Sequence, residues 1–260
     1  MLVLPLRYVG AVTLWAVRFF GAVGLVSART LLHLPGLDVR ELARALVLFG
    51  YRSLPLTLGA ATLIGATAVM QTSVYASQFG VRLYVGWAAG FALVWEFGPL
   101  LLGLIMAARI GARNAAELAL LTVNGQVEGL RGISLDPFRI LVAPRVVASA
   151  LSVLALSSVT FLVGITWEAV AAFFTLRLPL RAFLDSFELM LRWGDLVGGI
   201  CKSTAFGLAI AVVSTAAGLR ARGGAQGVGR AAAAAVVASC AAIFALDFIL
   251  TPWLSRIFAA

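Results

Sequence analysis

Long apolar stretches, each bounded by charged residues, divide the chain into five predicted membrane spans. The segment Ser53–Val81 holds 29 residues without Asp, Glu, Lys or Arg, whereas a bilayer core of about 30 Å needs only about 20 apolar residues per helix. The five predicted spans are residues 53–81, 83–108, 146–172, 196–219 and 231–254. The pattern therefore predicts an all-α, polytopic membrane protein with a single membrane domain over residues 53–254.

The first 52 residues are apolar, but regularly placed arginines predict an interfacial region at the membrane surface. Arg7, Arg18, Arg29 and Arg40 recur every eleven residues, a step of three helical turns plus about 20°. They would therefore align on one face of a helix. A basic stripe on an otherwise apolar helix favours the membrane surface. A signal peptide ending near Ala28 is the alternative, although an arginine would interrupt its apolar region.

The longest polar segment between two spans, residues 109–145, holds five arginines and three acidic residues. Residues 115–130 of this loop have the periodicity of one amphipathic helix. Its apolar stripe and its adjoining polar stripe consist of Leu120, Val123, Val127 and Leu130, and of Glu117, Asn124, Glu128 and Arg131. A short helix parallel to the membrane is a geometry by which a membrane subunit docks on a soluble partner. A plain interfacial loop helix is the alternative.

Composition supports the membrane class, and the distribution of charge orients the spans. Of the 260 residues, 62% are hydrophobic and 12% are charged, as expected for an integral membrane protein. Cytoplasmic loops are enriched in Lys and Arg, and a cytoplasmic N-terminus places 14 arginines on that side against five on the other. The C-terminus is then periplasmic. The net charge of +9 does not indicate nucleic-acid binding, because the arginines stand singly at span ends.

Cysteine, histidine and nucleotide-binding patterns predict no catalytic or metal site. Cys201 and Cys240 stand alone within predicted spans, and His33 is the sole histidine, so neither a metal site nor a catalytic triad is indicated. Lys202-Ser203 is the only Lys-Ser pair, and Cys201 stands where a phosphate-binding loop requires glycine. We expect no cofactor on this chain. If the protein uses ATP, another chain binds it.

Three ionisable residues inside predicted spans mark the candidate functional site: Glu96, Lys202 and Asp247. Each costs at least about 2.5 kcal/mol at the bilayer centre, so they should face a bundle interior or a water-filled cavity. At 1.5 Å per residue, Lys202 and Asp247 lie at similar depths and can pair, either as a structural ion pair or as the lining of a pathway. Glu96 lies about 9 Å deeper, without a cation at its depth. Pro99 is expected to kink the second span beside it.

Two other functional classes use the same residues differently. An ion-coupled secondary transporter would move its substrate through the three buried charges without an ATPase, but no inverted repeat relates the two halves of the chain. A membrane-embedded enzyme would need a converging catalytic set, which one histidine and scattered acids do not supply. Co-purification of an ATPase would discriminate between a permease and both alternatives.

Several sequence blocks, in the same order, resemble the MlaE (YrbE) permease family, whose members are membrane subunits of ABC transporters that work with MCE proteins. The resemblance extends from about Leu42 to Thr251. The blocks are Glu96-Phe97-Gly98-Pro99, Ala108-Arg109-Ile110-Gly111-Ala112, Ala115-Ala116-Glu117-Leu118, Asp136-Pro137, Ala143-Pro144-Arg145-Val146, Lys202-Ser203, Gly223-Gly224-Ala225-Gln226-Gly227-Val228-Gly229-Arg230 and Leu246-Asp247.

The resemblance implies five transmembrane helices after an interfacial elbow helix, and a homodimer with a lipid-sized cavity between the copies. It implies a non-catalytic permease driven by a separate cytoplasmic ATPase that binds ATP and Mg, with a periplasmic MCE lipid-binding protein and, in some systems, a small STAS-like cytoplasmic subunit. The expected location is the inner membrane of a Gram-negative bacterium. The expected function is to move phospholipids between the inner and outer membranes and so maintain outer-membrane lipid asymmetry.

The resemblance also assigns expected roles to particular residues. The substrate cavity or its gate would be lined by Glu96, Phe97, Gly98, Pro99, Lys202 and Asp247, and the ATPase contact would be made by Glu117, Leu120, Val123, Val127, Glu128, Leu130 and Arg131. The chain departs from the family pattern within this contact. Gly125 and Gly129 weaken helix propensity there by roughly 1 kcal/mol each.

Overall fold

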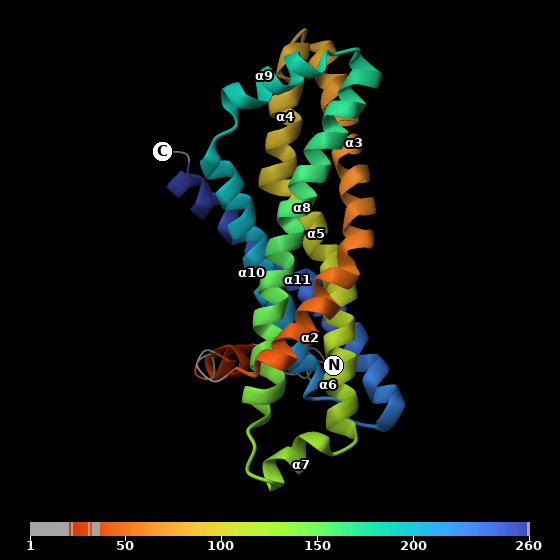
Figure 1. Cartoon of the computed structure of the whole chain (residues 1–260), viewed down its shortest axis with the longest axis vertical. Helices are drawn as coiled ribbons and strands as arrows, with labels where there is room; N and C mark the ends of the chain where they lie inside the picture. Colours follow the sequence, from red (N-terminus) through yellow and green to blue (C-terminus); the bar gives the residue numbers. More distant parts are fainter. Residues whose placement is uncertain (1–20, 22, 31, 33–36, 259–260) are drawn as a thin grey trace, which may run out of the picture.

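A computed structural model describes residues 21, 23–30, 32 and 37–258, and in this part of the chain every regular element is a helix. Five helical segments are long and apolar enough to cross a membrane, which confirms the predicted number of spans. They are Val39–Gln78, Arg82–Val123, Phe138–Leu176, Trp193–Gly218 and Gly224–Phe258. Figure 1 shows them as an elongated bundle with the 21–49 region near one end and α9 across the other.

The first span is preceded by an elbow helix, as expected. Helix α2 (Val39–Phe49) begins at Asp38, whose side chain accepts a hydrogen bond from the backbone of Arg40 at 2.9 Å, an N-cap interaction. A short 3₁₀ turn, η2 (Tyr51–Ser53), leads into α3 (Leu54–Gln78), which starts with a proline in its first turn. Helix α2 lies oblique to α3 (Figure 1). Of the predicted arginine stripe, Arg7 and Arg18 lie outside the described residues, and Arg29 and Arg40 are exposed.

The second span is one long helical segment with two wide, π-helical turns. It comprises the short η3 (Arg82–Tyr84), α4 (Val85–Ala92), the π turn η4 (Leu93–Phe97), α5 (Gly98–Met106), the π turn η5 (Ala107–Gly111) and α6 (Ala112–Val123). The helix therefore continues well past residue 108, where the apolar pattern ended. Helix α6 runs along the bundle axis (Figure 1).

The prediction of one helix over residues 115–130 is wrong, because the chain turns at Gly125. This glycine has a left-handed backbone with φ of 71°, a conformation that glycine adopts without steric cost. Helix α6 ends at Val123, and a separate helix α7 (Gln126–Gly132) lies across the end of the bundle (Figure 1). Only α7 has the transverse orientation that was expected of the whole segment.

The remaining three spans complete the bundle. A third π turn, η6 (Phe138–Val142), leads into α8 (Ala143–Leu176), followed by α9 (Leu180–Met190), α10 (Trp193–Gly218) and α11 (Gly224–Phe258). Small residues allow the closest approaches, as is usual for membrane helices. Gly86 and Gly90 of α4 face Phe183 and Phe187 of α9 in the same chain.

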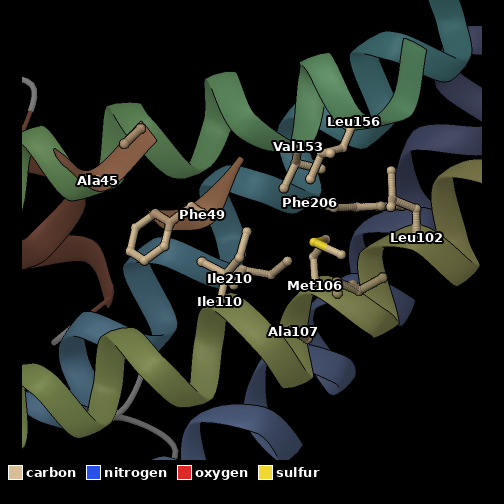
Figure 2. Packing of buried hydrophobic residues seen from close by; sticks show 12 residues of the cluster. Ala45, Phe49, Leu102, Met106, Ala107, Ile110, Val153, Leu156, Phe206 and Ile210 are labelled. Atoms are coloured by element: carbon tan, nitrogen blue, oxygen red, sulfur yellow. The ribbon is translucent and has the colours of Figure 1, made fainter. Parts of the chain in front are cut away.

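The main apolar core lies in the half of the bundle nearest α2 and joins α2, α5, α8 and α10. Figure 2 shows Phe49 from α2 and Leu102 and Met106 from α5, with Leu156 and Phe206 from the neighbouring helices, pointing into this core. Each of these side chains is at most 2% exposed. The elbow helix is thus packed into the bundle, and its position is tied to the second, third and fourth spans.

Candidate transport site

The three buried charges meet at one point, where Lys202 bridges the two acids. The Lys202 ammonium donates a hydrogen bond to Glu96 Oε2 at 2.7 Å and lies 2.8 Å from Asp247 Oδ1. The Lys202 side chain is completely buried, that of Asp247 is 12% exposed and that of Glu96 is 35% exposed. We call this cluster the charge triad. Its one cation stands between two carboxylates, and it opens to the outside on the Glu96 side.

The expected pair of Lys202 and Asp247 is present, but the expectation that Glu96 has no cation at its depth is wrong. Helix α10 begins at Trp193, three residues earlier than predicted, which moves Lys202 about 4.5 Å deeper from the end of its span. The long lysine side chain spans much of the remaining distance, as such chains do when they reach polar partners. Depth counted along straight helices therefore misplaced Glu96 relative to its partner.

Proline shapes the backbone around Glu96. In an α-helix the backbone N–H of residue 99 would donate to the carbonyl of Trp95, but Pro99 has no N–H. Instead, Lys202 donates to the Trp95 carbonyl at 3.0 Å, and Gly98 N–H bonds back five residues to the Leu93 carbonyl in the π turn. Proline is tolerated in membrane helices where other groups donate a hydrogen bond to the freed carbonyl in this way. The proline and the lysine thus form one local unit.

Two consecutive glycines let α10 approach the π turn closely enough for this contact. A Cβ atom at Gly198 would lie 2.6 Å from the Trp95 ring, and one at Gly199 would collide with the Val94 carbonyl oxygen. Lys202 follows Gly199 by three residues and so projects from nearly the same helix face. The glycine pair therefore brings the ammonium against Trp95 and Glu96.

An apolar groove lies between α3 and the second span, where the π turn meets α5. It has a volume of about 340 Å³ and includes Phe97, which follows Glu96 directly, and Leu101 one turn later. The α3 side contributes Leu63, Ile64, Thr67, Ala68 and Gln71. Phe97 is 42% exposed, whereas Gly98 and Pro99 are buried against the bundle. Of the predicted cavity residues, Glu96 and Phe97 are thus accessible, and the other four support them.

The residues predicted to contact an ATPase separate into two groups. Val127 is 4% exposed and lines a small cavity with Glu128 and Arg131 beneath Leu25 and Arg29 of the N-terminal region. Leu120 is 53% exposed, Glu128 and Arg131 are also exposed, and Val123 and Leu130 are half-buried. The break at Gly125 destroys the continuous apolar stripe that a single helix would present.

Glu117 belongs to an ionic network that sequence reasoning missed. Arg145 at the start of α8 lies 3.1 Å from Glu117 of α6 and 3.4 Å from Glu41 of α2. Arg113 also pairs with Glu117, at 2.9 Å. Beside them Asn114 donates to Ser214 of α10 at 2.8 Å. The network joins α2, α6, α8 and α10 at the α6 end of the bundle. Its only signal in the sequence was the pair Pro144-Arg145 at the start of the third span.

A third acid inside the spans, Glu168 in α8, was also missed although it lies inside the predicted third span. Its side chain is fully buried, and neither carboxyl oxygen has a hydrogen-bond partner among the described residues. It faces α4 near Gly90, where an added Cβ would lie 3.7 Å from Glu168 Oε2. It is not part of the charge triad. Because the third span was predicted to end near residue 172, Glu168 resembled a residue at the span boundary, whereas it lies eight residues before the end of α8.

Comparison with known proteins assigns the chain to a family. The sequence model of the permease MlaE matches residues 42–253, a range that includes the charge triad, the groove and all of the ionic network except Glu41. The chain belongs to the MlaE permease family. A probable ABC transporter permease protein of Rickettsia typhi is 30% identical over 246 residues, which cover 93% of this chain and 95% of the relative.

Other relatives support the same assignment. A probable ABC transporter permease protein of Rickettsia prowazekii is 31% identical over 240 residues, covering 90% of this chain and 93% of the relative. The chloroplast protein TRIGALACTOSYLDIACYLGLYCEROL 1 of Arabidopsis thaliana is 33% identical over 202 residues, covering 78% of this chain and 58% of the relative. An ABC permease of the MlaE family is a non-catalytic membrane subunit, and such permeases depend on a partner ATPase for ATP use.

Proposed function

We propose that this MlaE-family permease moves phospholipids between the inner and outer membranes of a Gram-negative bacterium and so maintains outer-membrane lipid asymmetry. In this proposal a cytoplasmic ATPase drives transport, a periplasmic MCE protein carries the lipid, and a small STAS-like subunit can join the complex. The N-terminus is cytoplasmic and the C-terminus periplasmic, as the arginine distribution favours. The observation that carries the proposal is the charge triad, open at Glu96, together with an apolar groove whose wall includes the next residue, Phe97.

This arrangement suits an amphipathic substrate. The groove offers apolar surface from α3, Phe97 and α5 for an acyl chain, and Glu96, the residue before Phe97, is the most exposed member of the triad. A polar headgroup could therefore reach the triad while its chains stay in the groove. The name of the Arabidopsis relative refers to a glycerolipid, which also supports a lipid substrate.

A homodimer would complete the cavity. A groove of about 340 Å³ lies at the small end of the range for small-molecule pockets, so a whole phospholipid needs a second surface. Helix α11, the least buried of the five spans, exposes Val237, Phe244, Phe248, Ile249 and Trp253. In the membrane this face can meet lipid or a second copy. We propose that two copies enclose the substrate between them.

The second span would link the ATPase to the triad. Glu96 and Glu117 lie on the same helical segment, 21 residues and thus about 32 Å apart. A force applied at α6 and α7 would be transmitted to the π turn at residues 93–97, where wide turns and proline make the helix adjustable. Movement there would alter the width of the groove beside Phe97. An ion-coupled secondary transporter would need no such partner, and the relatives named ABC permeases favour the ATP-driven mechanism.

The first experiment is affinity purification of the chain from native membranes, with identification of co-purifying proteins and lipids. The proposal expects an ATPase, an MCE protein and enriched phospholipid; the chain alone, with lipid matching the bulk membrane, would favour the secondary transporter. The second is ATP-dependent lipid transfer in proteoliposomes with Glu96→Gln. We expect reduced transfer, while the matched control Glu188→Gln, at an exposed acid of α9, stays normal. Normal transfer by Glu96→Gln in a fully assembled complex would remove Glu96 from the mechanism.

A further inference from the structure

A second and larger cavity lies at the α6 end of the bundle, away from the charge triad. It has a volume of about 580 Å³ and is formed between the elbow helix α2 and the helices behind it. Its principal lining residues are Arg44, Val47, Leu48, Arg52, Glu117 and Arg145. We call it the elbow groove. It combines arginine side chains with apolar surface and is not used by the transport mechanism proposed above.

Arg145 gives this groove a buried donor with no acceptor. Its side chain is only 10% exposed, and its two terminal nitrogens are taken up by Glu117 and Glu41. The third nitrogen, Nε, is buried without a hydrogen-bond partner among the described residues. An unpaired buried donor of a charged group costs about 1–3 kcal/mol or more. Arg145 keeps its positive charge beside the groove, while Nε itself has no surface that a ligand could reach.

Two further arginines stand at the mouth of the groove. The Arg44 side chain is 80% exposed, and its nearest acid, Glu41, is 3.8 Å away. Arg52 is exposed, and no ion pair of its guanidinium is found in the described part of the chain. Arginine is well suited to phosphate because its planar guanidinium can donate two parallel hydrogen bonds. The groove is lined by these two arginines and Arg145 against the two acids Glu41 and Glu117, and this net positive charge favours an anionic group over a cation.

The groove lies at the depth of the lipid headgroups. Arg52 immediately precedes the first span, and Arg109 of the second span donates hydrogen bonds to the Arg52 carbonyl and, at 2.9 Å, to Ser53 Oγ. The apolar stretches of residues 53–81 and 83–108 thus each have one end beside Arg52 of this groove. Val47 of α2 is 51% exposed and provides apolar surface beside the arginines. Basic pockets between membrane helices at this level are typical sites for anionic lipid headgroups.

We propose that the elbow groove binds an anionic phospholipid of the adjacent leaflet. Its phosphate would be held by Arg44 and Arg52, with the buried Arg145 adding positive charge behind them, and an acyl chain would lie along Val47 and Leu48. The N-terminal residues 1–20 contain no acidic side chain and so could not supply the anionic group themselves. This lipid would hold the elbow helix against the bundle, and it is distinct from the lipid that is transported.

Lipid binding can be measured by native mass spectrometry of the permease purified with its ATPase and incubated with mixed micelles of phosphatidylcholine and phosphatidylglycerol. We expect wild type to retain phosphatidylglycerol preferentially. The double variant Arg44→Gln/Arg52→Gln should lose about 25-fold of this preference, roughly fivefold for each arginine at a contribution of about 1 kcal/mol. Arg44→Lys/Arg52→Lys should keep most of it. The matched control, Arg82→Gln/Arg181→Gln at exposed positions of the opposite end, should resemble wild type.

Three results would overturn the proposal. Equal retention of the two lipids by wild type would show that the groove does not select anionic lipid. An unchanged preference in Arg44→Gln/Arg52→Gln, with a monodisperse complex, would place the lipid elsewhere. Displacement of phosphatidylglycerol by millimolar inorganic phosphate alone would identify a soluble anion as the ligand. None of these results depends on transport, so the proposed function would be tested separately.

Discussion

Replacement of Lys202 by methionine tests the energetics of the charge triad most directly. Methionine keeps the unbranched shape but removes the one cation that faces Glu96 and Asp247. Removing one partner of a buried ion pair typically destabilises a protein by about 3–5 kcal/mol, because the other charge stays buried and unpaired. Water can reach Glu96, which is 35% exposed, so the cost falls mainly on Asp247. We therefore expect a loss of about 3 kcal/mol.

The size of this effect can be measured by thermal unfolding of the purified permease in detergent. In chains of 150–250 residues, a change of 1 kcal/mol shifts Tm by about 2–4 °C, so Lys202→Met should melt about 6–12 °C below wild type. The triple variant Glu96→Gln/Lys202→Met/Asp247→Asn leaves no charge buried and should recover most of the lost stability. Replacing a whole buried ion cluster by neutral residues is often neutral or stabilising.

Two outcomes would contradict this reasoning. An exposed substitution such as Arg181→Met should shift Tm by no more than about 2 °C. If the Tm of Lys202→Met were as close to that of wild type, the triad would not be a buried ion cluster in the native protein. If the triple variant were as unstable as Lys202→Met, the loss would come from packing around the lysine stem and not from unpaired charge.

Three further substitutions probe the surroundings of the triad. Gly199→Ala should destabilise the protein by about 1–3 kcal/mol through overpacking against Val94 and lower Tm, whereas a Tm equal to that of wild type would show that α10 can move away at no cost. Glu168→Leu removes a buried carboxyl that has no partner and should raise stability by about 1–3 kcal/mol; a lower Tm would indicate an unseen partner. Pro99→Ala restores a backbone N–H that competes with Lys202 for the Trp95 carbonyl. It should reduce the amount of lipid transferred per ATP hydrolysed in proteoliposomes. An unchanged ratio of lipid transferred to ATP hydrolysed would exclude Pro99 from the motion of the second span.

The number of spans could be predicted from the sequence because it depends on the length of apolar stretches and on little else. The same holds for the identity of the triad residues, since a charge within an apolar span is visible without any structure. The pairing of Lys202 with Asp247 followed from depth alone. These features depend on position along one helix axis, and that quantity is counted directly in residues.

Features that depend on deviations from a regular helix could not be predicted in this way. The contact of Glu96 with Lys202 depends on a π turn and on a glycine pair in another span. Pro99 did indicate that a backbone bond was missing, but it gave no sign that a lysine side chain would replace it. At Gly125, weakened helix propensity was recognised, whereas the left-handed turn that divides the helix was not.

Contacts between distant parts of the chain could not be predicted from the sequence either. Arg145 meets Glu41, which is 104 residues away, and Glu117, which is 28 residues away. Each of the three had been interpreted only within its own segment. Glu168 shows a related problem, because its depth in the third span could be counted but its orientation toward α4 could not.

The positions of the polar clusters suggest why this bundle tolerates them. The apolar core of Phe49, Met106 and Phe206 lies in the part of the molecule that joins the elbow helix to three spans, and it contains no ionisable side chain. Glu96 of the charge triad and Glu117 of the network around Arg145 lie on the same long second segment, with Met106 of this core between them in the sequence. Ionic clusters can exchange partners, whereas close-packed apolar side chains lose contacts when they shift against one another. We therefore infer that the core moves as a unit. Changes in shape would then be concentrated at the π turn beside Glu96 and at the turn at Gly125 that follows this segment, because the other π turn, Ala107–Gly111, lies within the core.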